Sequence, residues 1–191
     1  IQSRAITEAF GAFGSGKSEY SVHFSRKLKA EGETVSLVDL DVVNPYFRSR
    51  DVKDEFSRIG IEVVAPEGQF RHADLPMISP RIKAVIEDRQ RNVILDVGGD
   101  PAGCRALGRF VEPVNNRGYE MILVINTNRP FTSNTEEILI MHGVLEFASK
   151  LKITEYICNT NLMELTTLDN IKEGIDIIQK AADQANVRFE T

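Results

Sequence analysis

The chain has 191 residues, of which 42% are hydrophobic and 27% are charged, and its net charge is -5 with an isoelectric point of about 5.3. This length and composition are those of one globular domain, residues 1–191, that can bury a sizeable core. The acidic balance argues against bulk binding to nucleic acid or to an anionic membrane, and no apolar run approaches the roughly 18 residues of a membrane span.

The cysteine content and the first residues predict a compartment. Cys104 and Cys158 are the two cysteines of the chain, which is too few for a disulfide scaffold. A reducing, cytoplasmic compartment is therefore expected. The opening residues, Ile1 to Arg4, lack the charged and apolar regions of a secretory signal peptide.

Short apolar runs recur along the chain with helical segments between them. Several of them, such as Val93-Ile94-Leu95, are apolar at consecutive positions, which is typical of a parallel strand covered on both faces. Strands that alternate with helices predict an α/β fold, a doubly wound and mostly parallel sheet of about seven strands with helices on both faces. The predicted strands are Ala5–Phe10, Thr34–Asp39, Ile61–Ala65, Asn92–Val97, Glu120–Asn126, Glu155–Asn159 and Val187–Phe189.

Helical periodicity fills the intervals between these strands. Residues 17–31 place apolar side chains on one face, and Gly32 ends that helix. A second clear pattern predicts a helix over 133–149. Thr166 and Asp169 are spaced as a variant capping box, with Asp in place of Glu or Gln, before the last helix.

The first strand is followed by GAFGSGKS, residues 11–18, which matches the P-loop pattern in full. Glycines let the backbone turn so that several N–H groups face one polyphosphate, and the following helix adds its positive N-terminal dipole. Lys17 would reach the β- and γ-phosphates, and Ser18 would supply a hydroxyl to Mg²⁺. The predicted nucleotide-contacting residues of this segment are Gly11, Gly14, Ser15, Gly16, Lys17, Ser18 and Glu19.

Two further strands end in carboxylates. The stretch VDLDVVNP places Asp39 and Asp41 at the carboxyl end of the second strand, from which they can reach the phosphate side of the sheet. The stretch LDVGGD ends another buried strand at Asp96, which can hold Mg²⁺ through water. Gly99 can then turn its N–H toward a γ-phosphate and sense whether that group is present.

These motifs, in this order and spacing, resemble the SIMIBI class of P-loop NTPases. Within that class they are similar to the MinD/ParA/nitrogenase-iron-protein branch, the CobQ/CobB/MinD/ParA nucleotide-binding domain family. The resemblance covers residues 6–162, because YICN at 156–159 is similar to that branch's base-reading strand end. It implies that Asn159, together with Asn126 or Asn128, recognises the base.

The resemblance also implies roles for the acidic residues. Asp41 would polarise the attacking water. Asp39 and Asp96 would support the water shell of a Mg²⁺ ion that Ser18 binds directly. The catalytic residues implied in this way are Lys17, Asp39 and Asp41.

One position departs from that branch, whose P-loop has a second lysine just after the first glycine that acts across a dimer interface. This chain has Ala12 there. Either another residue supplies the positive charge that this lysine lends to the transition state, or hydrolysis is slow. Arg48 and Arg50 are the candidates for such an arginine finger. The departure weakens the inference of a nucleotide-dependent homodimer, which is kept as one alternative.

Three functions fit these motifs. The leading one is an ATP-binding switch with Mg²⁺-dependent hydrolysis that acts on a protein partner in maturation, positioning or metallocentre assembly. The second is a small-molecule kinase, with residues 66–80, including Arg71 and His72, as its acceptor lid. The third is a binding module that has lost hydrolysis. ATP is favoured over GTP because the chain contains no Asn-Lys-x-Asp sequence.

Overall fold

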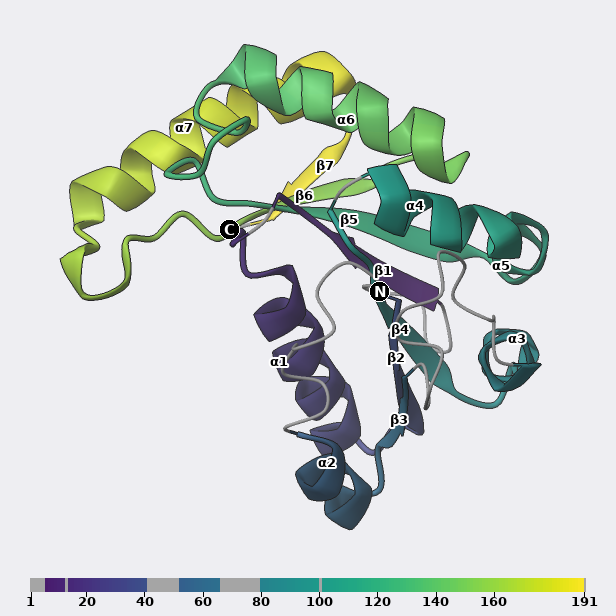
Figure 1. Ribbon diagram of the computed structural model, residues 1–191. Helices are drawn as coiled ribbons and strands as arrows, with labels where there is room; N and C mark the ends of the chain where they lie inside the picture. The colour runs from purple at the N-terminus through teal and green to yellow at the C-terminus, as the bar shows by residue number, and fades with distance from the viewer. Residues whose placement is uncertain (1–5, 13, 41–51, 66–79, 100, 191) are drawn as a thin grey trace.

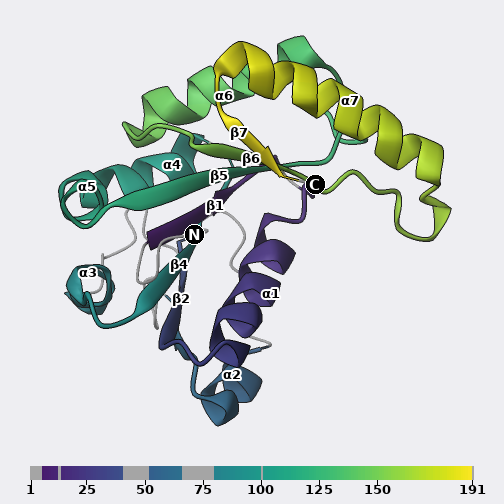
Figure 2. The same ribbon diagram turned by 180° about the vertical axis from the view of Figure 1, so that it is seen from behind.

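The computed structural model of the protein describes residues 6–12, 14–40, 52–65, 80–99 and 101–190. Within these residues, seven strands form one parallel sheet in the order β3-β2-β4-β1-β5-β6-β7 (Figures 1 and 2). This confirms the predicted α/β fold with a doubly wound sheet. The strands are β1 Ile6–Phe10, β2 Val35–Asp39, β3 Glu62–Val64, β4 Asn92–Asp96, β5 Tyr119–Ile125, β6 Glu155–Cys158 and β7 Arg188–Glu190.

Helices lie on both faces of the sheet. Figures 1 and 2 show α1 and α2 on one face and α4, α5, α6 and α7 on the other. None of the helices in the described part of the chain is both long and apolar enough to cross a membrane. The helices are α1 Lys17–Ala30, α2 Lys53–Ile59, α3 Pro80–Glu87, α4 Pro101–Leu107, α5 Val111–Arg117, α6 Thr135–Ser149 and α7 Leu168–Ala185.

The central strands are buried on both sides, which explains their continuous apolar runs. In β4, Val93 and Leu95 belong to the larger core cluster, together with residues of α3 to α7. Ile94 lies between them and belongs to the second cluster, with Leu28 of α1 and Phe56 of α2. Successive residues of a strand point to opposite faces, so two helical layers require apolar residues at every position.

The cap of α7 differs by one residue from the predicted capping box. The structure places the cap at Thr167, whose hydroxyl accepts from the Asn170 backbone N–H at 3.2 Å, while the Asn170 side chain accepts from the Thr167 N–H at 3.3 Å. The prediction of Thr166 and Asp169 was wrong because the Thr166 hydroxyl closes the preceding 3₁₀ turn by donating to the Met163 carbonyl at 2.6 Å.

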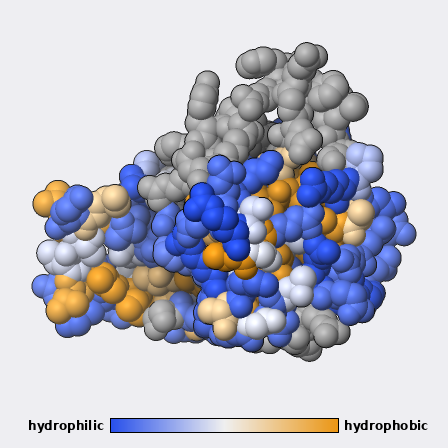
Figure 3. Space-filling model, turned by 90° about the horizontal axis from the view of Figure 1, so that it is seen from below, coloured by the Kyte–Doolittle hydropathy of each residue, from blue (hydrophilic) through white to orange (hydrophobic). Residues whose placement is uncertain are grey.

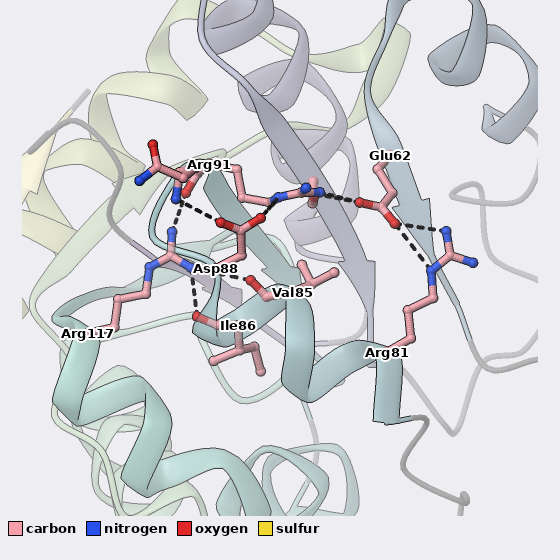
Figure 4. A network of polar contacts seen from close by, with 9 residues as sticks. Glu62, Arg81, Val85, Ile86, Asp88, Arg91 and Arg117 are labelled. Atoms are coloured by element: carbon pink, nitrogen blue, oxygen red, sulfur yellow. Dashed lines mark hydrogen bonds and ion pairs between the residues drawn. The ribbon is translucent and has the colours of Figure 1, made fainter.

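A network of polar contacts ties α3 and α5 to the sheet beside the first residues of β3 and β4 (Figure 4). Arg117, the last residue of α5, donates to the Ile86 carbonyl at 2.7 Å and also bonds the Arg91 carbonyl. Arg91 donates to Asp88 at 2.7 Å and pairs with Glu62 of β3. The network lies at the amino-terminal edge of the parallel strands, so it stabilises the end of the sheet opposite the P-loop.

The carboxyl group of Glu8 is buried in the centre of the sheet with no hydrogen-bond partner among the described residues. Glu8 lies in the middle of β1, opposite Leu95 of β4 and Met121 of β5. Its side chain is fully buried, and among the residues described neither carboxylate oxygen has a hydrogen-bond partner. Burial raises the pKa of Glu8 well above its ordinary range. The folded protein therefore keeps a proton that the unfolded chain releases near pH 4.3.

Replacing Glu8 with methionine is expected to raise the free energy of unfolding by about 1–3 kcal/mol at neutral pH, because an unpaired buried polar group is removed. Above about pH 4.3 the unfolded chain binds fewer protons at this position than the folded protein does. The wild-type free energy of unfolding should thus fall as pH rises from there through the folded pKa. Urea unfolding at several pH values measures both effects.

Glu173→Met, at an exposed position of α7, is the matched control. It should leave both the free energy of unfolding and its pH dependence close to wild type. A Glu8→Met protein with the wild-type stability and the same pH slope would contradict the expectation.

Candidate nucleotide-binding site

The predicted P-loop joins β1 to α1 at the carboxyl edge of the sheet. Gly14 and Gly16 adopt φ angles of 76° and 91°, in the left-handed region that glycine enters without a steric penalty. The Ser15 N–H donates to the Ala12 carbonyl at 2.9 Å, and the Tyr20 N–H makes a helical bond to the Gly16 carbonyl at 2.9 Å. The glycines thus make a tight turn that leads directly into the first turn of a helix.

Lys17 and Ser18 open α1, and both are buried, with 9% and 2% of their surfaces exposed. Within the described residues, the hydroxyl oxygens of Ser15 and Ser18 are buried and have no hydrogen-bond partner. Leaving a buried polar group unsatisfied costs about 1–3 kcal/mol, and a ligand at this place would remove that cost. Mg²⁺ prefers oxygen ligands, so the orphaned Ser18 hydroxyl fits the predicted direct contact with Mg²⁺.

The two predicted acidic residues that the structure describes lie side by side. Asp39 ends β2 and Asp96 ends β4, and the two are direct partners in the parallel register. Asp96 is in turn the register partner of Ala9 in β1, just before the P-loop. Both carboxylate side chains are buried. The register therefore puts Asp39 and Asp96 in one row at the sheet edge from which the P-loop leaves.

A metal ion at this edge would need ligands beyond protein carboxylates. In the segments that the structure describes, no group of three or more His, Cys, Asp or Glu side chains could hold a metal ion. Mg²⁺ commonly binds through one or two protein groups together with water and substrate phosphates. Ser18, Asp39 and Asp96 fit a magnesium site of that kind, completed by a polyphosphate.

The loop after β4 packs against the P-loop backbone. A Cβ atom at Gly99 would lie 1.6 Å from the Gly11 carbonyl oxygen, so only glycine fits there. On its other side this loop meets α4, since a Cβ at Gly103 would lie 2.7 Å from Gly98 Cα. Cys104 of α4 is buried and donates through its thiol to the Gly98 carbonyl at 3.7 Å. The loop is therefore held between the P-loop and α4.

Asn159, predicted to read the base, lies against the P-loop. Its Nδ2 donates to the Ser15 carbonyl at 2.7 Å and would lie 2.1 Å from a Cβ at Gly16. Asn126, predicted to help recognise the base, has its side-chain amide bonded to backbone: Nδ2 donates to the Asn161 carbonyl at 3.1 Å, and Oδ1 accepts from the N–H groups of Asn128 and Asn161. Asn126 thus connects the loops after β5 and β6.

The P-loop has a further contact that no sequence motif indicates. Arg129, in the loop between β5 and α6, donates from Nε to the Gly14 carbonyl at 3.1 Å. Glu19, also predicted to contact the nucleotide, pairs through Oε1 with His23 Nε2 at 3.1 Å on the exposed side of α1, and its contact with a nucleotide stays a prediction. A single arginine in a polar loop carries no sequence signal, so Arg129 becomes visible only when the loops are brought together.

Several predicted residues lie outside the described part of the chain. These are Asp41, predicted to polarise the attacking water, the candidate arginine fingers Arg48 and Arg50, and the residues Arg71 and His72 of the predicted kinase lid. Their roles stay predictions.

Comparison of the sequence with protein-family models and with curated proteins found no match. Solved structures are similar over nearly the whole chain. The cell division protein FtsY from Thermotoga maritima has a TM-score of 0.67 and 18% identity, covering 97% of this chain and 60% of FtsY. The signal recognition particle 54 kDa protein from Aeropyrum pernix, in complex with GDP, has a TM-score of 0.65 and 17% identity, covering 98% of this chain and 41% of that protein.

A third similar structure binds an adenine nucleotide. The nucleotide-binding protein from Archaeoglobus fulgidus, in complex with ADP, has a TM-score of 0.54 and 14% identity, covering 97% of this chain and 79% of that protein. Together with the parallel sheet, these similarities define the class of fold: it is an α/β, P-loop NTPase-like fold that matches those of FtsY and the signal recognition particle 54 kDa protein. At such identities the likeness is one of fold, and this chain spans only 60% of the length of FtsY.

Proposed function

We propose that residues 1–191 form an ATP-binding domain that works as a nucleotide-dependent switch, with slow Mg²⁺-dependent hydrolysis, on a protein partner. The observation that supports this proposal is the P-loop with a buried Lys17 and a buried Ser18 hydroxyl that has no partner among the described residues. Both lie at the sheet edge that Asp39 and Asp96 share. The MinD/ParA resemblance of the three motifs supports a switch within the SIMIBI class, and the cysteine content favours a cytoplasmic setting.

Each described residue has a chemical task in this proposal. The amides of the P-loop and the Lys17 ammonium group bind the polyphosphate. Ser18 would hold Mg²⁺, with Asp39 and Asp96 on its water shell, and the ion would neutralise charge on the β- and γ-phosphates. Gly99 would report the γ-phosphate to α4, because its loop is packed between the P-loop and Gly103.

Adenine is the base we propose. With Nδ2 bonded to Ser15, the Asn159 side chain still offers its Oδ1 acceptor, for which the described residues supply no donor. An acceptor matches the N6 amino group of adenine, whereas guanine has a carbonyl oxygen at the corresponding position. Calorimetric titration with Mg-ATP and Mg-GTP tests the choice, and tighter binding of GTP would reverse it.

A protein partner is the second part of the proposal. Exposed apolar side chains occur in the two loops that flank the P-loop, among them Phe131 after β5 and Met163 after β6. Both residues have positive φ, at 67° and 55°, a conformation that is strained for a bulky side chain. The face seen from below is largely hydrophilic, with apolar patches at its left end and in its middle (Figure 3). We therefore place the partner at the nucleotide edge, where a nucleotide-dependent homodimer would also form.

Asp41→Asn tests hydrolysis. We expect the variant to keep its affinity for Mg-ATP and to lose about 10²–10⁴-fold in the rate of hydrolysis, because a general base is lost while the phosphate cradle remains. Single-turnover release of phosphate, without any added acceptor, measures the rate. Asp54→Asn, at an exposed position of α2, is the control. Unchanged turnover would assign the base to another residue, and transfer of the γ-phosphoryl group to a metabolite would replace the switch by a kinase.

A further inference from the structure

Two consecutive carbonyl groups of the P-loop are held by side chains from two other loops. The Gly14 carbonyl accepts from Arg129 Nε at 3.1 Å, and the Ser15 carbonyl accepts from Asn159 Nδ2 at 2.7 Å. Arg129 also packs on the glycine itself, because a Cβ at Gly14 would lie 3.1 Å from its Nε and 3.2 Å from its Cζ. Side chains of the loops after β5 and β6 thus hold the P-loop through its backbone carbonyls.

These hydrogen bonds to the P-loop carbonyls affect how the loop can bind phosphate. A loop whose N–H groups face a phosphate turns its carbonyl groups away from that phosphate. Those carbonyls need donors of their own, and a glycine-rich segment has many alternative conformations. Donors fixed on Gly14 and Ser15 therefore favour the one conformation in which the amides converge on the ligand.

Arg129 and Asn159 belong to one hydrogen-bonded network. The Arg129 N–H donates to the Asn126 carbonyl at 3.0 Å, and Asn126 Nδ2 donates to the Asn161 carbonyl at 3.1 Å. Asn161 Nδ2 in turn donates to the Asn159 carbonyl at 2.7 Å. The loops after β5 and β6 therefore act on the P-loop as a single support.

The charge of Arg129 is not used for an ion pair in the described part of the chain, where the one polar contact of its side chain is with the Gly14 carbonyl. An arginine has five N–H donors in a rigid plane. Because one of them holds the loop, the planar group is fixed in position with its positive charge beside the P-loop. The charge adds to that of Lys17 at a place where a polyphosphate is expected.

We propose that Arg129 is a positioning residue of the phosphate cradle, which fixes the P-loop through Gly14 in concert with Asn159. The proposal rests on the proposed nucleotide binding. It assigns Arg129 to the P-loop backbone and not to the base, so its effect should be the same for any ligand that the cradle holds by phosphate.

The test measures affinity for Mg-ATP and for inorganic tripolyphosphate, a probe without a base or a ribose. Calorimetry on Arg129→Met should show about tenfold weaker binding of both ligands. Arg129→Lys should recover part of the loss, because an ammonium group can also donate to the Gly14 carbonyl. Arg58→Met, an exposed arginine of α2, should bind both ligands like wild type.

A second readout separates positioning from general stabilisation. Hydrogen exchange of the amides of residues 14–18 should become faster in Arg129→Met, while the amides of β4 and β5 keep their protection. Uniformly faster exchange across the core would show that Arg129 merely stabilises the fold, and would overturn the proposal.

The binding data can overturn it in two further ways. Unchanged affinity for both ligands would show that the contact with Gly14 does not matter. A loss confined to Mg-ATP would assign Arg129 to the base or the ribose. If the wild-type protein bound tripolyphosphate but no nucleotide, the proposed function would be wrong. The effect of Arg129 on phosphate binding could still be measured with tripolyphosphate.

Discussion

Replacing Lys17 with alanine is expected to weaken the binding of Mg-ATP by at least about 100-fold. The ammonium group is expected to contact both the β- and the γ-phosphate, and hydrogen bonds to charged groups contribute about 1.5–3 kcal/mol each. The side chain is buried at the first position of α1, so no neighbouring lysine can take its place without moving the helix. Isothermal titration calorimetry at fixed Mg²⁺ concentration measures the change.

Lys27→Ala is the matched control, because Lys27 lies on the same helix but is exposed. It should bind Mg-ATP like wild type. Both variants should keep the wild-type circular dichroism spectrum and melting temperature to within a few degrees. If Lys17→Ala bound Mg-ATP with wild-type affinity, the P-loop would not be the nucleotide site, and the proposed function would fall with it.

Replacing Gly99 with alanine is expected to disrupt the site through the loop after β4, which packs on the P-loop backbone. The new Cβ would lie 1.6 Å from the carbonyl oxygen of Gly11 and 2.6 Å from its carbonyl carbon. Both are backbone atoms, so the P-loop or the loop after β4 must move as a whole. We expect nucleotide binding to be lost and the free energy of unfolding to fall by about 1–3 kcal/mol. Calorimetry and urea unfolding measure the two effects.

Gly143→Ala, the matched control, adds the same methyl group at a position where it meets no other atom. Gly143 lies within α6, and an added Cβ there meets nothing within 4 Å. Alanine should leave binding unchanged and stabilise the helix by up to about 1 kcal/mol. A Gly99→Ala protein that binds Mg-ATP as tightly as Gly143→Ala would show that the close contact between Gly99 and Gly11 is not required.

Much of the fold can be predicted from the sequence because it depends on local patterns. Apolar residues at consecutive positions, as in Val93 to Leu95, indicate a strand between two helical layers, and the structure packs those positions into two different core clusters. The boundaries are less predictable, since they depend on single hydrogen bonds. The cap of α7 is Thr167, one residue after the predicted Thr166, because the Thr166 hydroxyl donates to a carbonyl of the preceding turn.

Part of the site is predictable for the same reason. The residues from Gly11 to Ser18 are contiguous, so their sequence alone specifies a turn with glycines where φ must be positive. Asp39 and Asp96 each end a strand, and parallel strands present their carboxyl ends at one edge. That the two are direct register partners follows from β2 pairing with β4, a neighbour that is not next in the chain.

The amino-acid sequence by itself determined the P-loop, the strand-ending carboxylates and the class of sheet, because each is written in residues that are close together in the chain. Only the tertiary structure decided which side chains support the P-loop. Arg129 and Asn159 lie 115 and 144 residues away from the carbonyls they hold. They reach the loop because β5 pairs with β1 and β6 pairs with β5, an order set by the packing of the whole chain. Glu8 shows the same limit, since a glutamate in a strand can point to water. Here the fold buries it, and the part of the chain that the structure describes offers its carboxylate no hydrogen-bond partner.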